Sequence, residues 1–153
     1  NLSDWNGKFI LLSFIFSRCP MPNMCPAVIM KNQDLSHKFK ENQNVEFLLI
    51  SFDYEYDTPI ILKNQYEGIF IDNKNIHFLS SYQHKEDILK ITSEIGMGFA
   101  GIEDMDEKNI GHTLVSVLLD SEGNLVSKYQ GDSWTPKEVK EKLSNRLNVY
   151  KLD

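Results

Sequence analysis

The chain has 153 residues, of which 41% are hydrophobic and 25% are charged, and its formal net charge is −6 at pH 7. This length suits one domain over residues 1–153, with a core large enough to fold without cross-links. The negative charge argues against nucleic acid and anionic membrane surfaces as partners, and no apolar run approaches the ~20 residues of a membrane span.

The first third of the chain alternates buried-strand and helix patterns. Residues 8–16 (KFILLSFIF) are almost all apolar, which predicts a strand buried on both faces of a sheet. Pro26 opens a helix that continues to about residue 42. The apolar stripe of this helix consists of Val28, Ile29, Leu35 and Phe39. Residues 45–52 predict a second buried strand, so the three elements form a βαβ unit.

Two further helices and a short strand follow. Asp57 or Thr58 caps a helix that runs from Pro59 to about Tyr66. Residues 76–79 form a short strand, and residues 84–95 form a helix that Gly96 ends.

The last third is predicted to contain a loop, a hairpin and a final helix. Residues 96–111 form an irregular loop whose acidic cluster, Glu103 to Glu107, is expected to be solvated rather than a docking surface. Residues 113–119 and 124–129 form a hairpin, and the capping box from Thr135 to Glu138 starts the helix. The order β-α-β-α-β-α-β-β-α is that of a thioredoxin-like α/β fold, with a central mixed sheet flanked by helices.

Both cysteines of the chain, Cys19 and Cys25, lie in the loop SRCPMPNMCP between the first strand and its helix. The sequence places Cys25 at the N-cap, where free N–H groups and the helix dipole favour a thiolate, and Arg18 adds a positive charge. Pro20 and Pro22 restrict the loop. Such a loop fits a redox pair or a soft-metal site, and a structural disulfide is the third interpretation.

A metal site needs a further ligand, and one of the histidines is placed to supply it. Thiolates select Cu(I), and imidazole serves either oxidation state of copper. His37 is expected to be a solvated helix residue, and His77 and His84 to be structural. His112 follows the irregular loop and precedes an apolar strand, at the end of the sheet where the cysteine loop lies. We therefore take His112 as the candidate third ligand.

Three segments, NLSDWNGKFILLSFIFSRCP, SFDYEYDTP and GHTLVSVLLDSEGNLV, resemble the Sco/SenC family of copper proteins needed for cytochrome c oxidase assembly. The resemblance implies that Cys19, Cys25 and His112 bind copper and that Asp53 and Asp57 form a supporting acidic pair. It implies a metallochaperone that delivers copper to, or matures, the copper centre of an oxidase subunit. It also implies an exported protein, periplasmic or membrane-anchored and facing the periplasm, with a strand pair and an anchor upstream.

The sequence departs from the family pattern at three places. Five residues separate the cysteines, where the family has three. This longer loop could favour disulfide chemistry or admit Met21 or Met24 as a ligand, although packing is the simpler role for both. Gly111 replaces the Asp that usually precedes the histidine, and Tyr54 replaces a Pro.

The alternative function is a thiol–disulfide oxidoreductase that keeps the cysteines of a copper-site target reduced, with Cys19 as the more exposed nucleophile. Thioredoxin-type enzymes place a cis-Pro opposite the cysteine pair. The corresponding loop here, residues 109–113, has no proline and offers His112 instead. This difference favours metal binding over general disulfide exchange.

Overall fold

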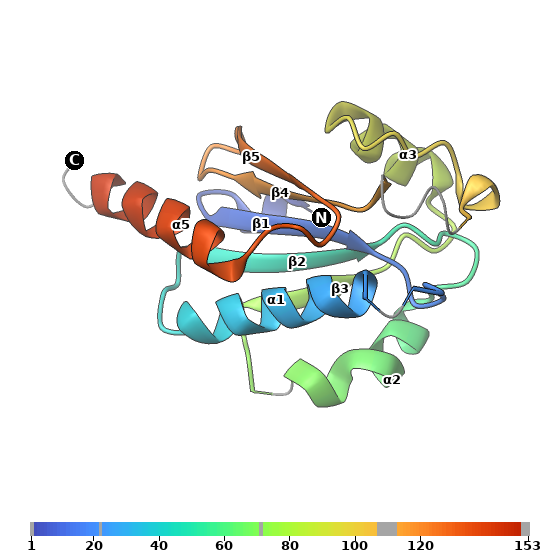
Figure 1. Cartoon of the computed structure of the whole chain (residues 1–153), viewed down its shortest axis with the longest axis horizontal. Helices are drawn as coiled ribbons and strands as arrows, with labels where there is room; N and C mark the ends of the chain where they lie inside the picture. The colour runs from blue at the N-terminus through green and yellow to red at the C-terminus, as the bar shows by residue number, and fades with distance from the viewer. Residues whose placement is uncertain (1, 22, 71, 107–112, 151–153) are drawn as a thin grey trace.

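The computed structural model describes residues 2–21, 23–70, 72–106 and 113–150. Within these ranges, the strands form one mixed five-stranded sheet in the order β3-β2-β1-β4-β5, with α-helices on both faces (Figure 1). The strands β1, β2 and β3 are parallel, β4 is antiparallel to β1, and β5 is antiparallel to β4. This is the mixed α/β sheet that the sequence predicts.

The elements have the following bounds. The strands are β1 (Phe9–Ile15), β2 (Val45–Ser51), β3 (Ile76–Leu79), β4 (Val115–Leu119) and β5 (Leu125–Gln130). The α-helices are α1 (Cys25–Lys38), α2 (Pro59–Phe70), α3 (Lys85–Glu94) and α5 (Pro136–Tyr150). Short 3-10 helices cover Leu2–Trp5 and Ile102–Asp104. Among the described residues, no helix combines the length and apolar character needed to cross a membrane.

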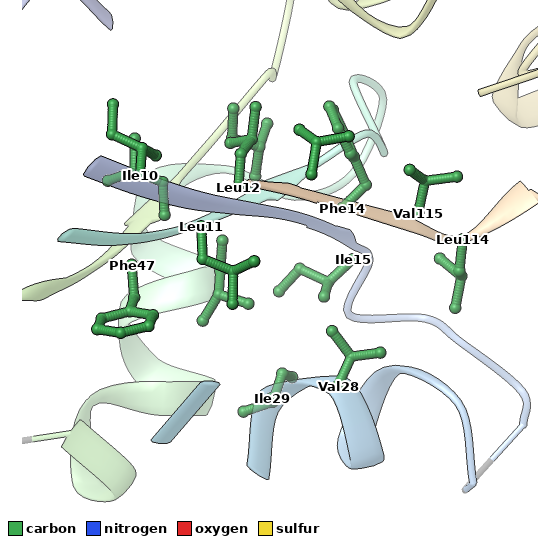
Figure 2. Packing of buried hydrophobic residues seen from close by; sticks show 14 of the residues in the cluster. Ile10, Leu11, Leu12, Phe14, Ile15, Val28, Ile29, Phe47, Leu114 and Val115 are labelled. Atoms are coloured by element: carbon green, nitrogen blue, oxygen red, sulfur yellow. The ribbon is translucent and has the colours of Figure 1, made fainter. Parts of the chain in front are cut away.

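The two central strands form the core because every residue of β1 and β2 is buried. Their side chains alternate between the faces, as Figure 2 shows for β1. Leu11 and Ile15 point toward α1, whereas Ile10, Leu12 and Phe14 point to the opposite face. Figure 1 shows α1 and α2 on one side of the sheet and α3 on the other. A strand covered on both faces needs an unbroken apolar run, and this is why the sequence pattern identified both strands.

The predicted boundaries differ from the observed ones at helix ends. The helix α1 stops at Lys38, because the Asn42 N–H turns back to the Phe39 carbonyl at 2.9 Å and starts the chain toward β2. The helix α2 extends beyond Tyr66 to Phe70. The predicted capping box at α5 is confirmed: the backbone N–H of Thr135 donates to Glu138 Oε2 at 2.7 Å.

A buried polar network ties α1 to the sheet. The Asn32 side chain donates to Ser13 Oγ at 3.0 Å, and Ser13 Oγ lies 2.8 Å from Ser116 Oγ. All three residues are buried, so each hydrogen bond replaces water that the groups have lost. The network fixes α1, whose first residue is Cys25, over β1 and β4.

The topology brings three loops to one edge of the sheet. Because β1 and β2 are parallel, the chain leaves Ile15 and Ser51 at the same edge, where the Phe52 N–H donates to the Ile15 carbonyl at 3.0 Å. Because β4 is antiparallel to β1, the residues that precede Val115 approach from that edge too. The cysteine loop, the acidic pair and the start of β4 are therefore neighbours.

We predict that Leu11→Ala lowers the free energy of unfolding by about 2–5 kcal/mol, because the side chain is 0% exposed and its loss leaves a cavity between β1 and α1. Urea denaturation followed by circular dichroism measures the change. The matched control is Leu125→Ala on β5, where the side chain is 55% exposed and the expected change is within about 0.5 kcal/mol. Equal effects of the two variants would contradict this account of the core.

Candidate functional site

The cysteine loop connects the end of β1 to the start of α1. Cys25 is the first residue of α1, and Met24 rather than Cys25 occupies the N-cap. The sequence-based placement is therefore wrong by one position, because Pro26 fits the second helical position as well as the first. Cys25 is 1% exposed, whereas Cys19 is half-buried. Cys19 is thus the more accessible thiol, as the sequence predicts.

The two cysteines have pKa values shifted in opposite directions. A hydrogen bond from the Cys25 side chain lowers the pKa of Cys19 to about 6, against the opposing effect of burial, and backbone hydrogen bonds from Cys25 and Met21 lower it further. The same contact raises the pKa of Cys25, and burial adds to that rise. The expectation of a thiolate at Cys25 is therefore wrong. The thiolate forms on Cys19, because the deeper sulfur is desolvated and keeps the proton.

The positive charge of Arg18 serves a different purpose from the one expected. Its guanidinium donates from Nε to Asp53 Oδ2 at 2.7 Å and from the terminal nitrogen to Asp53 Oδ1 at 3.0 Å. It also lies 4.5 Å from the centre of the Tyr56 ring. Arg18 therefore binds the loop that follows β2, and its positive charge pairs with Asp53 rather than with a thiolate.

The acidic pair anchors the two residues that precede Cys19. Asp53 and Asp57 are both 0% exposed. Asp53 accepts the two bonds from Arg18. Asp57 accepts the Ser17 backbone N–H at 2.8 Å, and it also accepts the hydroxyl groups of Ser17 and Ser51. A buried carboxylate is costly unless its oxygens are hydrogen-bonded, so these contacts hold the start of the cysteine loop against β2.

The two methionines of the loop both pack against the hydrophobic core. Met24 is 8% exposed and belongs to the core cluster, while Met21 is half-buried and contacts it. The Met21 carbonyl oxygen lies 3.7 Å from Cys19 Sγ, close enough to accept from the thiol form. The main chain of Met21 therefore contacts the Cys19 sulfur. The side chain of Met24 packs in the hydrophobic core.

The structure describes three of the four histidines, His37, His77 and His84. His112 lies outside the described residues. His37 is exposed on α1, as expected. The Nε2 atom of His77 lies 2.8 Å from Glu46 Oε2, and Nδ1 of His84 lies 3.3 Å from Asp87 Oδ2, so both have structural partners. Among the residues that the structure describes, no three His, Cys, Asp or Glu side chains are grouped to hold a metal ion.

Several residues of the site were not found by sequence reasoning. Ser17 and Ser51 complete the hydrogen bonds of Asp57, but isolated serines carry no sequence signal for that role. Burial raises the pKa of the Tyr66 phenol on α2, and the nearby acidic groups of the two cysteines and Asp57 add to that rise. A cavity of about 280 Å³ adjoins the cysteine loop. Its lining consists of Phe16, Arg18, Pro20, Asp53, Ile102 and Met105.

The low pKa of Cys19 predicts how alkylation of the reduced protein depends on pH. Only a thiolate reacts with iodoacetamide, so the rate at Cys19 should rise through about pH 6 and level off above it. In Cys25→Ala the midpoint should move upward, because the hydrogen bond that contributes most to the low pKa is lost. Quenching the reaction at set times, followed by peptide mass spectrometry, gives the alkylation rate at each cysteine. A wild-type midpoint near the ordinary thiol pKa of ~8.5 would contradict the assignment.

Comparisons with known proteins identify a matching family and several similar structures. The SCO1/SenC family model matches residues 1–148. BsSco, a member of the Sco family described with a disulfide switch, has a TM-score of 0.75 at 25% identity, over 94% of this chain and 82% of that chain. A SCO1/SenC family lipoprotein from Bacillus anthracis has a TM-score of 0.71 at 27% identity, over 95% and 84%. Arabidopsis thaliana ScoI, solved with copper bound, has a TM-score of 0.71 at 22% identity, over 97% and 89%.

The fold itself is thioredoxin-like. The exposed lipoprotein thioredoxin Etrx1 of Streptococcus pneumoniae has a TM-score of 0.58 at 20% identity, over 94% of this chain and 89% of that chain. No curated protein matched the chain in sequence. The family model covers nearly all of the sequence, and the sheet that carries the cysteine loop is shared with solved Sco proteins. The chain belongs to the SCO1/SenC family.

Proposed function

We propose that the chain is a copper metallochaperone of the Sco/SenC type, which binds copper through Cys19, Cys25 and His112. It would deliver copper to, or mature, the copper centre of a cytochrome c oxidase subunit. The observation that carries the proposal is the hydrogen bond between the side chains of Cys19 and Cys25 in the loop from β1 to α1, which lowers the pKa of Cys19 to about 6. Two adjacent soft sulfurs, one of them already a thiolate, form the donor set that Cu(I) prefers.

The donor set fits copper if His112 completes it. Two sulfurs alone leave a copper ion open to solvent, and the described residues offer no further histidine or carboxylate grouped with them. Asp53 and Asp57 are occupied by Arg18, Ser17 and Ser51, so their supporting role is to hold the loop rather than to bind metal. An imidazole supplied at the start of β4 would meet the cysteine loop at the edge they share.

The similar proteins support this proposal. Arabidopsis thaliana ScoI, yeast Sco1 and Bradyrhizobium japonicum ScoI have each been solved with copper bound. BsSco is described as a member of a family of cytochrome c oxidase assembly proteins. The Bacillus anthracis and Streptococcus pneumoniae proteins are lipoproteins. We accordingly propose an exported protein, periplasmic or membrane-anchored and facing the periplasm, whose partner is a copper-accepting oxidase subunit or another copper protein.

A second candidate function is thiol–disulfide oxidoreductase activity on the cysteines of a copper-site target. The different pKa values of the two cysteines favour it, because a half-buried thiolate beside a protonated partner can attack a disulfide and then be resolved by that partner. In this reaction Cys19 forms the mixed disulfide, and Cys25 then releases the reduced target as Cys19 and Cys25 become oxidised. His112 has no necessary part in these steps, which separates the two functions.

Replacing His112 distinguishes the copper metallochaperone from the thiol–disulfide oxidoreductase. We predict that His112→Ala weakens Cu(I) binding by 100-fold or more, roughly 2.8 kcal/mol at about 1.4 kcal/mol per decade. Disulfide formation between Cys19 and Cys25 should remain largely intact. Competition with a calibrated copper chelator measures the affinity, and a glutathione or dithiothreitol series measures the thiol redox potential.

The matched control for this experiment is His37→Ala, which removes an exposed imidazole from α1 and should leave copper affinity unchanged. Equal affinity of His112→Ala and wild type would remove His112 from the site. A wild-type protein that binds no copper would defeat the chaperone proposal and leave the oxidoreductase as the better account.

The methionines of the loop are expected to support the site by packing. Leucine nearly conserves the volume of methionine, so Met24→Leu and Met21→Leu should each leave the absorption and EPR spectra of the Cu(II)-loaded protein unchanged. Met24 gives the firmer expectation, because its side chain is 8% exposed within the core. A changed spectrum in either variant, with unchanged circular dichroism, would place that thioether among the ligands.

A further inference from the structure

The hydroxyl group of Tyr54 is the centre of a hydrogen-bonded cluster beside the site. It donates to Glu103 Oε2 at 2.7 Å and accepts the backbone N–H of Ile102 at 3.1 Å. The ring is buried, with 5% of the residue exposed. Tyr54 stands directly after Asp53, which holds Arg18. Asp53 in the loop that follows β2 therefore binds the cysteine loop, and Tyr54 binds residues 99–105, which we call the latched segment.

Lys85 at the start of α3 completes the cluster. Its ammonium group donates to Glu103 Oε1 at 2.8 Å and lies 5.2 Å from the centre of the Tyr54 ring. Both donors together lower the pKa of Glu103 to about 2, with the bond from Lys85 contributing most. Glu103 is therefore ionised at neutral pH, where it pairs with Lys85. We call these three residues, Tyr54, Lys85 and Glu103, the tyrosine latch.

The backbone of the latched segment is shaped to reach Tyr54. Gly101 has a φ of 152°, a value that side-chain-bearing residues rarely adopt. A Cβ atom added there would lie 2.3 Å from Glu103 Oε2 and 3.2 Å from the Tyr54 hydroxyl oxygen. The absence of a side chain at Gly101 thus allows the carboxylate and the phenol to meet.

A row of aromatic rings runs from the latched segment to the cysteine loop. Ring centres are separated by 6.5 Å between Tyr54 and Phe99, by 5.0 Å between Phe99 and Phe52, and by 4.8 Å between Phe52 and Phe16. The Phe16 carbonyl in turn accepts the Cys19 N–H at 3.4 Å. The latched segment therefore packs through the rings of Phe99 and Phe52 onto Phe16, which holds the backbone of Cys19.

The latched segment also faces the cysteine loop across the 280 Å³ cavity. Ile102 and Met105 form one side of it, and Arg18 and Pro20, the two neighbours of Cys19 in the chain, form another. His112 follows Met105 by seven positions in the sequence. The latch therefore fixes the last part of the described chain before His112 at a point beside Cys19.

We propose that Tyr54 is a positioning residue of the candidate copper site: through Glu103 and Ile102, it fixes the chain that leads to His112 next to the cysteine loop. The inference rests on the proposed function for its effect on copper. A ligand supplied by an anchored chain loses less conformational entropy when it binds than one supplied by a free chain. Loss of the latch should therefore weaken copper binding only while His112 is present.

The test is a double-mutant cycle on the full chain. Tyr54→Phe removes the hydroxyl group and keeps the ring that packs on Phe99. We expect Cu(I) affinity to fall roughly tenfold, as for other groups that orient a ligand, and to be unchanged when Tyr54→Phe is added to His112→Ala. Hydrogen–deuterium exchange of the copper-free protein should rise in residues 99–105. The matched control is Tyr129→Phe, which removes a phenol hydroxyl from β5 and should change neither measurement.

The outcomes separate the latch from the proposed function. Tyr54→Phe values equal to those of Tyr129→Phe, with wild-type copper binding intact, would overturn the inference alone. A tenfold loss that persists in the His112→Ala background would also overturn it, because Tyr54 would then act by another route. Failure of the wild-type protein to bind copper would overturn both. Glu103→Ala, at an exposed position, should reproduce the direction of both changes, and it replaces Tyr54→Phe if that variant does not fold.

Discussion

Two buried carboxylates hold the cysteine loop in place, and the geometry of the site depends on them. Asp57 binds Ser17, and Asp53 binds Arg18, so both residues before Cys19 are fixed to the loop that follows β2. An unsatisfied carboxylate in the interior is very unfavourable. Movement of Ser17 would leave Asp57 short of hydrogen bonds, and this cost holds the residues that precede Cys19 in place.

The position of Cys19 then determines its chemistry. The fixed loop places its sulfur against the Cys25 thiol, which lies in the core at the start of α1. Burial keeps the proton on Cys25, and the hydrogen bond that Cys25 donates stabilises the charge on Cys19. A thiolate next to a thiol serves both a soft-metal site and a dithiol pair. The choice between these functions rests on the third ligand.

The sequence predicted the sheet well because its central strands are buried on both faces. The apolar runs of β1 and β2 have no competing interpretation, whereas the end of α1 depends on a turn toward β2 that has no glycine or proline to mark it. The two cysteines and the acidic pair could also be found from sequence. The side chains that hold the acidic pair could not, because Ser17 and Ser51 acquire their roles only when the ends of β1 and β2 meet at one edge.

Two residues near the cysteine loop, Tyr54 and Arg18, have roles that the sequence did not predict. Tyr54, which replaces a proline, uses its hydroxyl group to bind the segment that leads toward His112. The sequence suggested only that the position was unusual, since a tyrosine gives no indication of a partner about fifty residues away in the chain. The expected positive charge near the thiols was also misassigned, because Arg18 and Asp53 neutralise each other in the folded protein.

We propose that one copper ion binds between the cysteine loop and the chain that enters β4. X-ray absorption spectroscopy of the protein loaded with one equivalent of Cu(I) is the decisive measurement, because the extended fine structure identifies the atoms bound to the metal. We expect two sulfur ligands and one imidazole nitrogen, with the number of sulfur ligands falling from two to one in Cys19→Ala. A copper environment composed only of nitrogen and oxygen, or one unchanged by Cys19→Ala, would contradict it.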